Sequence, residues 1–351
     1  MTPGQYVLRY GRQEGMARIA QGTVKADADF GEGYWTDHWS YGLDLIEDFL
    51  RIWPEREQEL MQMELPWYRP QAQILPREKR YSVSGGELRQ YHFLEETPGE
   101  KWCRDGAENL VKATLLEKLV CMCAMKFAAL DAWGCGIEME GGRPGWYDAL
   151  NGLPALFGSS VTEAMELLRH LRFLKVSLRR YGGKVSLPGP HYMLLMRLKQ
   201  SVEDIPEYTG NTVLVDFWNS SKSALEHCRE EVYTQGAWDY ADCQAEQLAE
   251  MLDTWANFLG QRLALCRGEN GVMPTYCRYR VKMDQGTPSF EKCDMPLFLE
   301  SSVRDMRLCE SEQKREKLFE AVHRSELFDG KLGMSVSYTH LRAHETLANL
   351  V

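Results

Sequence analysis

The residues best suited to chemistry lie in a stretch rich in glycine and proline, Gly141-Gly-Arg-Pro-Gly-Trp-Tyr-Asp148. Glycine and proline break helices and hold sharp turns, so this stretch predicts an exposed loop between two helical runs. The carboxyl group of Asp148 closely follows the indole of Trp146. A flat indole can face a sugar ring while an acid reaches the sugar's oxygens, so the pair indicates a carbohydrate site. The simpler interpretation is a surface aspartate beside a packed tryptophan.

Polar residues on both sides of Asp148 extend the candidate site. Glu138 and Glu140 can orient the acid or bind sugar hydroxyl groups, and an acidic neighbour would raise the pKa of Asp148 and help keep it protonated. Their alternative role is to tie the loop to backbone donors. Arg143 can bind phosphate or pair with Glu140, and Asn151 can close the turn or hold a hydroxyl group.

Two motifs carry a resemblance to a known family. Trp146-Tyr147-Asp148 is similar to the Trp-Asn-Asp segment that bears the general acid of cellobiose-phosphorylase-like enzymes, which form glycoside hydrolase family 94 with relatives such as β-1,3-glucan phosphorylases. The likeness continues through residues 136–160. Earlier in the chain, Asp37-His38 resembles the family's Ser-Asp-Asp-His segment, whose aspartate grips the sugar in subsite −1. Tyr147 stands where the better-known enzymes have asparagine, which leaves the substrate open.

The resemblance implies an inverting phosphorolysis that converts a β-linked glucan or disaccharide into an α-sugar 1-phosphate. Asp148 would protonate the glycosidic oxygen while Asp37, His38 and Trp146 hold the sugar ring. Inorganic phosphate would be the co-substrate, and no metal or organic cofactor is expected. Arg89 lies in a stretch that also resembles the relatives, where it would be a substrate-side donor or part of a solvated hairpin.

Two other functions remain open from the sequence. An inverting hydrolase would use water in place of phosphate and would need a second carboxylate as base, either Glu138 or a residue outside this chain. A non-catalytic glycan-binding scaffold would keep the fold without the chemistry. Phosphate dependence of product formation distinguishes a phosphorylase from a hydrolase. Binding of an oligosaccharide without turnover would identify a scaffold.

Composition limits the partners. The chain has 351 residues and a net charge of −10, which argues against a nucleic-acid partner and leaves neutral substrates open. The partners that the resemblance implies are an oligosaccharide and phosphate. Its ten cysteines include no Cys-x-x-Cys pair, so buried free thiols such as Cys121 and Cys266 in a reducing cytoplasm are expected. No signal peptide and no membrane-spanning run are apparent. The relatives are often dimers, so a homodimer is one expectation.

Apolar periodicity predicts a mostly helical chain. A helix is expected to begin at Asp37 and to end before Pro54, and an inserted hairpin or long loop is expected at about residues 65–100, with strand-like runs around Gly85-Gly86. Further helices are predicted over 107–130, 160–180, 191–202, 219–233, 238–265 and 311–327, with strands within 268–282. Periodicity indicates only helical hairpins joined by loops that carry the site. The resemblance implies that these hairpins form a partial (α/α)6 barrel of six-hairpin glycosidase type.

Both ends of the chain suggest a piece of a longer enzyme. Residues 335–351 look like a translated sequencing adaptor and are predicted to be a non-native tail, which leaves residues 1–334 as part of the catalytic domain. The first family-like motif begins at Phe30, without the large β-sandwich that precedes it in the relatives. Such a fragment is expected to be inactive alone.

Overall fold

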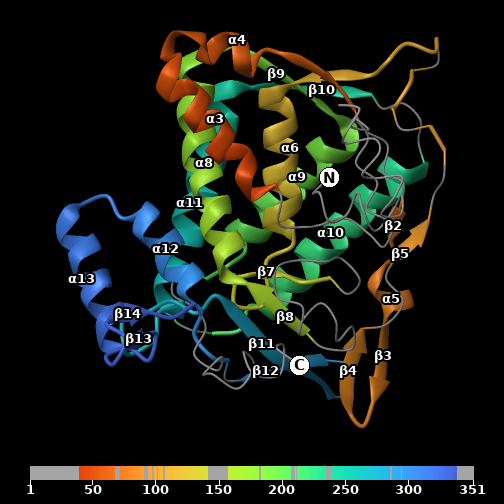
Figure 1. Ribbon diagram of the computed structural model, residues 1–351. Helices are drawn as coiled ribbons and strands as arrows, with labels where there is room; N and C mark the ends of the chain where they lie inside the picture. The colour runs from red at the N-terminus through yellow and green to blue at the C-terminus, as the bar shows by residue number, and fades with distance from the viewer. Residues whose placement is uncertain are drawn as a thin grey trace, which may run out of the picture.

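The computed structural model describes residues 39–337 apart from 68–71, 91–93, 97–98, 101, 106, 141–156, 182, 207–209, 211, 235–238, 285–286 and 294. Its longer helices gather on one side of a six-stranded sheet, which lies below them in Figure 1. The helices are α3 (Ser40–Ile52), α4 (Glu57–Met61), α5 (Arg77–Arg80), α6 (Leu115–Ala128), α8 (Val161–Tyr181), α9 (Gly189–Glu203), α10 (Val215–Thr234), α11 (Ala245–Cys266), α12 (Leu299–Leu308) and α13 (Glu312–Arg324), with a 3-10 turn η1 (Pro54–Arg56).

Helix α6 forms the centre of the helical layer and contacts α8, α9 and α10. Val120, Ala124 and Phe127 on this helix are fully buried. The ring of Phe127 stacks on that of Trp255 in α11, with their centroids 4.4 Å apart. Burial of such large rings is the main source of stability in a core of this kind. The helix predicted for this part of the chain is therefore confirmed from Leu115 onward, and it packs through a buried apolar face.

Helix α6 begins later than predicted. The hydroxyl of Thr114 accepts a hydrogen bond from the amide of Glu117, and the Glu117 carboxylate accepts one from the amide of Thr114. This capping box satisfies two backbone donors that the first helical turn would leave free. The preceding residues, Lys112–Thr114, pair as strand β6 with β1 (Glu64–Pro66). The prediction of a helix over 107–130 was thus wrong at its start.

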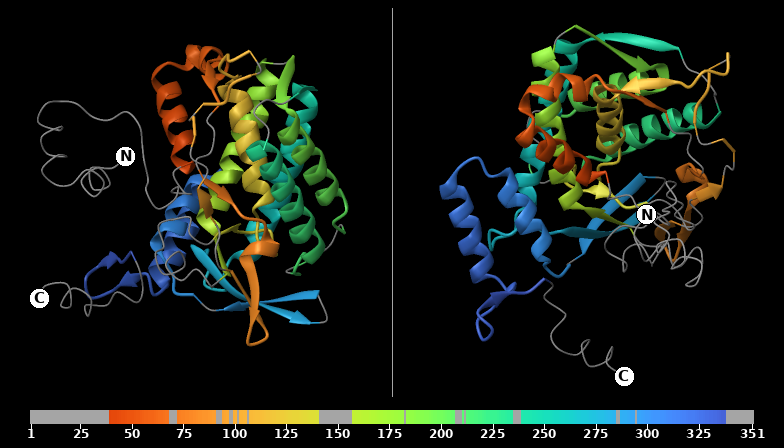
Figure 2. Two further views of the ribbon diagram at one scale, coloured as in Figure 1. Left: turned by 90° about the vertical axis from the view of Figure 1, so that its right-hand side faces the viewer. Right: turned by 45° about the horizontal axis from the view of Figure 1, so that its top comes forward.

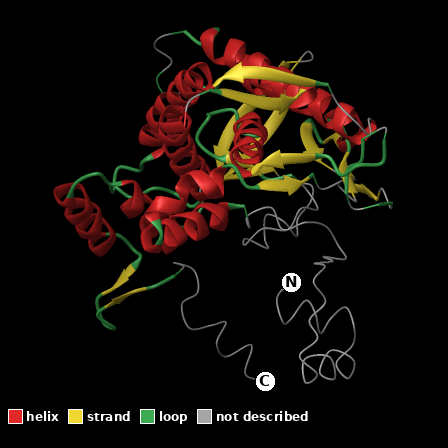
Figure 3. Ribbon diagram, turned by 90° about the horizontal axis from the view of Figure 1, so that it is seen from above, coloured by secondary structure: helices red, strands yellow, loops and turns green. Residues whose placement is uncertain are grey.

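The six-stranded sheet is antiparallel and runs β3-β4-β11-β8-β7, with β12 also paired to β11 (Figure 3). Its strands are β3 (Tyr81–Ser84), β4 (Glu87–Gln90), β7 (Ile137–Glu138), β8 (Phe157–Ser160), β11 (Tyr276–Asp284) and β12 (Thr287–Cys293). Strand β11 pairs with β8 from Tyr276 opposite Ser160 to Tyr279 opposite Phe157. The sheet therefore joins segments that are far apart in the sequence.

Shorter ladders complete the structure. The predicted turn is present between β3 and β4, where Gly85 and Gly86 both have positive φ, as a tight two-residue hairpin requires. Helices α12 and α13 lie at the edge of the molecule in both views of Figure 2. The other pairs are β2 (Ala72–Ile74) with β5 (Leu94–Glu96), β9 (Lys184–Pro188) with β10 (Tyr240–Gln244), and β13 (Phe328–Asp329) with β14 (Met334–Ser335).

The structure corrects the predicted fold class. Within the described residues the helices do not close a barrel, and strands occur from β1 to β14 rather than in one small insertion, so the fold is α+β and not a mostly helical (α/α)6 barrel. The reason lies in β11, whose buried Tyr279 and Val281 require apolar partners. These partners include Phe157 on β8, so the sheet packs against the helices instead of leaving them to pair around an axis.

The cysteine prediction holds for Cys121, which is a buried free thiol, and fails for Cys266. Cys266 forms a disulfide with Cys135. The end of α11 is brought to this place by Arg262, whose Nε donates to the carbonyl oxygen of Trp133 at 2.6 Å. Spacing in the sequence gives no sign of a pair formed in this way.

Two further findings concern the ends and the membrane. Within the predicted adaptor tail, Ser335 pairs with Phe328, and the amide of Val336 donates to the carbonyl of Leu327 at 2.7 Å. Residues 338–351 lie outside the described part. Across the described residues, every helix is too short or too polar to cross a lipid bilayer.

Candidate functional site

The segment that carries the predicted general acid connects a short antiparallel hairpin. Strands β7 and β8 pair with Glu138 opposite Ser159. Beyond that pair, the amide of Met139 donates to the carbonyl oxygen of Gly158 at 2.8 Å. The described residues that flank 141–156 are therefore held side by side at the edge of the sheet.

The predicted site residues divide into two groups. Six of them lie outside the described residues: Asp37, His38, Arg143, Trp146, Asp148 and Asn151. Of the other three, Glu138 and Glu140 lie at the base of the 141–156 segment. Arg89 lies on β4, where its guanidinium pairs with the carboxylate of Glu87 at 2.6 Å. The structure thus brings Glu138 and Glu140 together and leaves Arg89 on a different strand.

A buried aspartate fixes the turn that leads into β7. One carboxylate oxygen of Asp131 accepts from the amides of Trp133 at 3.0 Å and Cys135 at 3.1 Å. The other accepts from the hydroxyl of Ser159 on β8 at 2.6 Å. Burial raises the pKa of Asp131 above its usual value, and these hydrogen bonds offset only part of the rise. The turn and the hairpin are therefore joined through a single side chain.

Gly136 provides a test of this arrangement. A methyl group there would lie 2.4 Å from the Ser159 hydroxyl and 2.9 Å from a carboxylate oxygen of Asp131. We expect Gly136→Ala to lower the free energy of unfolding by about 1–3 kcal/mol, measured by urea denaturation. The matched control is Gly42→Ala in α3, where a methyl group would meet nothing within 4 Å and should favour the helix. Equal stability of the two variants would contradict the close contact at Gly136.

Glu138 is held by donors from three other elements. One oxygen accepts from Trp218 Nε1 at 2.8 Å and from the hydroxyl of Tyr279 at 2.7 Å. The other lies 3.4 Å from the hydroxyl of Tyr81 and 3.6 Å from Nζ of Lys222. Burial, and then the Glu138 charge, raise the pKa of both tyrosines. Burial lowers the pKa of Lys222, while Glu138 favours its charged form.

Glu140 is gripped by arginines at the start of the 141–156 segment. Its two oxygens accept from the guanidinium of Arg229 on α10 at 2.7 and 3.0 Å, a bidentate pair. Arg80 at the end of α5 approaches the same carboxylate at 3.8 Å. Burial alone would lower the pKa of Arg229, but Glu140 outweighs it and leaves this pKa above its usual value. Glu140 is therefore held by arginine side chains, whereas its alternative role required backbone donors.

A cavity of about 230 Å³ opens beside these two glutamates. Its wall combines one face of α6 with the β7 strand and with side chains from α8, α9 and α10. Carboxylates, cationic groups and three methionines all border it. The lining residues are Trp67, Lys118, Cys121, Met122, Met125, Lys126, Ala129, Ile137, Glu138, Met139, Glu140, Glu163, His191 and Arg229. A lining that combines polar and apolar side chains suits a small ligand that carries hydroxyl groups on an apolar frame.

His191 in this cavity is buried without a full set of partners. It is 4% exposed, its ring stacks on Trp67 at 5.5 Å, and its Nδ1 has no hydrogen-bond partner among the described residues. Burial lowers the pKa of His191 to about 4. The imidazole is therefore neutral at pH 7.

The lowered pKa predicts a loss of stability in acid. Above pH 6.5 the folded and unfolded states both carry neutral His191, so it contributes no pH dependence. As the pH falls from 6.5 towards 4, only the unfolded state takes up the proton, and up to about 3 kcal/mol of stability is lost. His191→Phe should flatten the stability curve in this range, measured by urea denaturation at each pH. Burial also lowers the pKa of His170 to about 4, so His170 contributes to the same pH dependence in both proteins. The variant should therefore lose only the part of the slope that His191 contributes.

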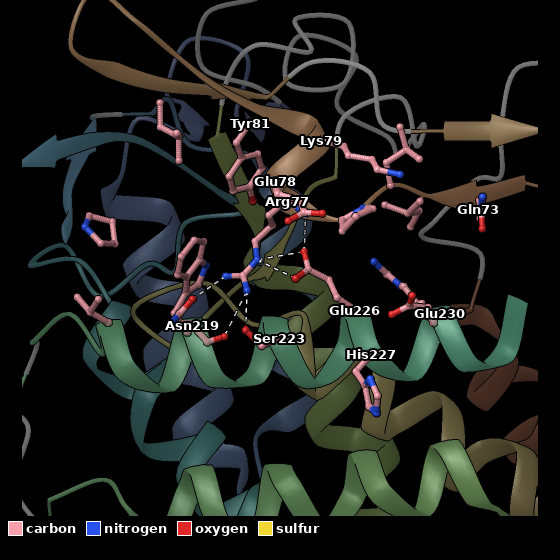
Figure 4. Close-up of a pocket in the computed structure, with 18 of the residues that line it drawn as sticks. Gln73, Arg77, Glu78, Lys79, Tyr81, Asn219, Ser223, Glu226, His227 and Glu230 are labelled. Atoms are coloured by element: carbon pink, nitrogen blue, oxygen red, sulfur yellow. Dashed lines mark hydrogen bonds and ion pairs between the residues drawn. The ribbon is translucent and has the colours of Figure 1, made fainter. Parts of the chain in front are cut away.

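A larger groove, of about 1030 Å³, lies between α10 and the chain from β2 to β3. Figure 4 shows Arg77 reaching from α5 down to α10, where it meets Glu226, Asn219 and Ser223. Arg229 borders both this groove and the smaller cavity. Because the Arg77 guanidinium already donates hydrogen bonds to these partners, it is not free to bind a ligand in the groove.

Several residues of the site were not predicted from the sequence. Asp131 follows an apolar helix and precedes Ala-Trp-Gly-Cys-Gly, a pattern typical of a side-chain-capped turn, so a signal for it existed. Lys222 and Arg229 gave no such signal, because charged residues within a helix usually face solvent. Here both are buried, at 4% and 8% exposed.

Comparison with known proteins leaves the family of this chain open. No protein-family model matches the sequence, and no curated protein matches it. The likeness of its two motifs to the cellobiose-phosphorylase-like enzymes therefore remains an expectation drawn from those residues.

Proposed function

We propose that this chain carries the acid-bearing part of a glycoside phosphorylase. In this proposal, a β-linked glucan or disaccharide is cleaved with inversion by inorganic phosphate, and the product is an α-sugar 1-phosphate. Asp148 acts as the general acid on the glycosidic oxygen. The observation that supports the proposal is that Glu140, which immediately precedes the segment bearing Trp146 and Asp148 in the chain, lines a cavity of mixed polar and apolar character.

The network around Glu138 bears on the choice between phosphorolysis and hydrolysis. A general base for water must expose a carboxylate oxygen to that water. Glu138 is 5% exposed, and both of its oxygens are occupied by neighbouring donors. This disfavours Glu138 as the base of a hydrolase. A phosphorylase needs no such base, because phosphate is itself the anionic nucleophile.

The wider setting follows from the same proposal. Eight of the ten cysteines are free, which favours a reducing compartment, so we place the enzyme in the cytoplasm. Its substrates would be an oligosaccharide and phosphate, without a metal or organic cofactor. A homodimer remains the expected assembly.

The test is the phosphate dependence of product formation. The source DNA is first resequenced across the codons for residues 333–351, and the reading frame that results is expressed. The purified protein is then incubated with β-linked gluco-oligosaccharides, with and without inorganic phosphate, and sugar 1-phosphate is followed by phosphorus NMR. Product that requires phosphate supports the proposal. Reducing sugar released without phosphate would indicate a hydrolase, and binding without any product would indicate a scaffold.

A further inference from the structure

The disulfide between Cys135 and Cys266 joins the base of the candidate site to the helical core. Cys135 lies in the turn immediately before β7, and Cys266 is the last residue of α11. The amide of Cys135 donates to Asp131, and Asp131 accepts from Ser159 on β8. The cross-link therefore continues directly into the hairpin of β7 and β8.

The free state of the other cysteines makes this disulfide unusual. The other eight cysteines are free, and six of them are buried. A chain with so many unpaired thiols is typical of a reducing compartment, where a disulfide is more often a reversible redox element than a permanent brace. One bond among eight free thiols is thus suited to forming and breaking.

The two sulfur atoms differ in access. Cys135 lies at 0% exposure, whereas Cys266 is partly exposed at the end of its helix. Nζ of Lys292 lies 3.9 Å from the sulfur of Cys266. An ammonium group beside a sulfur favours its thiolate form. Once the disulfide is reduced, Lys292 therefore stabilises the thiolate of Cys266, which is also the more exposed of the two cysteines.

We propose that the Cys135–Cys266 disulfide is a reversible redox link that sets the rigidity of the turn before β7 and of the hairpin formed by β7 and β8. In the oxidised state, α11 holds the turn covalently. In the reduced state, α11 holds it through Arg262, which donates to the carbonyl of Trp133 at 2.6 Å. The hairpin therefore stays folded after reduction but opens locally more often.

Reduction follows ordinary thiol–disulfide exchange. The thiolate of a small dithiol attacks the exposed sulfur of Cys266 and releases Cys135 as a thiolate, which takes up a proton. The second thiol of the reductant then displaces Cys266 from the mixed disulfide and closes the reductant's own disulfide. Two electrons pass from the dithiol to the protein pair. Glutathione disulfide oxidises the two protein thiols again and is itself reduced to two molecules of glutathione.

The first experiment counts thiols in the full chain. The protein is equilibrated in a graded series of reduced and oxidised glutathione, quenched in acid, unfolded, alkylated and weighed by mass spectrometry. We expect a transition between eight and ten free thiols, with the missing two mapping to Cys135 and Cys266. Ten free thiols under every condition, or a different pair, would overturn the proposal.

The second experiment measures whether the link matters to the site, with a readout that does not depend on the proposed function. Hydrogen exchange of the hairpin amides at Glu138 and Met139 is followed in both redox states. We expect exchange to be several-fold faster after reduction, and Cys266→Ser to exchange at the reduced rate in either buffer. Cys309→Ser, which removes a partly buried free thiol elsewhere, should behave like the unmodified protein. Equal exchange in both states would show that the bond is inert.

Discussion

Replacing Asp148 by asparagine is expected to slow the cleavage of an ordinary β-linked substrate by about 100- to 10,000-fold while leaving the fold intact. An amide cannot give up a proton, so the leaving sugar oxygen would have to depart as an alkoxide. The rate is measured as the initial release of sugar 1-phosphate by the protein expressed from the complete reading frame. Circular dichroism and a urea transition establish that the variant remains folded.

A change of substrate separates loss of the acid from loss of binding. An aryl glycoside with an acidic phenol as leaving group needs little protonation, so the Asp148→Asn variant should retain most of its activity on that substrate. The control variant Asp48→Asn removes a carboxylate from an exposed ion pair on α3. It should cleave both substrates at the unmodified rate. Near-normal cleavage of the unactivated substrate by the Asp148 variant would show that another group is the acid.

Removing the buried carboxylate of Glu138 is expected to have the largest effect on stability. Glu138→Ala leaves Lys222 buried as a cation whose remaining contact is the carbonyl of Ala129 at 2.9 Å. It also leaves Trp218 and Tyr279 without their acceptor. Breaking a buried pair from one side costs about 3–5 kcal/mol, so the urea midpoint should fall sharply.

Two companions to this variant make the result specific. Combining Glu138→Leu with Lys222→Met removes both charges and should be less destabilising than Glu138→Ala, because no ion is left unpaired. Glu59→Ala removes an exposed glutamate that pairs with Arg56, and its unfolding transition should not move. If Glu138→Ala and Glu59→Ala unfold at the same urea concentration, the Glu138 network is not a source of stability.

Helices and local turns were the features most open to prediction from the sequence. The periodic runs that became α8, α9, α10 and α11 are long enough for one apolar face to repeat several times. The hairpin of β3 and β4 was predictable because Gly85 and Gly86 supply the positive φ angles that its turn requires. These features depend on neighbours in the sequence, and so a local pattern records them.

The sheet and the site depend on distant partners, and the sequence pattern did not reveal them. Strand β8 is a run of Phe-Gly-Ser-Ser without alternating polarity, and β7 has two residues. Their pairing with each other and with β11 is specified by tertiary packing. The partners of Glu138 likewise come from α10 and β11, and Cys266 is 131 residues from Cys135. The barrel was expected from two motifs, neither of which lies within the described residues in full.

The central position of β11 also has a consequence for how this protein matures during synthesis. Strand β8 is made early, but its partner in the register from Tyr276 to Tyr279 is made much later. Until β11 leaves the ribosome, one edge of β8 has no hydrogen-bonding partner, and Tyr279 has not yet joined the core. Formation of the base of the site must therefore wait for translation to pass Asp284. A ribosome that stalls before this point would hold a nascent chain with most of its helices but without the scaffold of its candidate site.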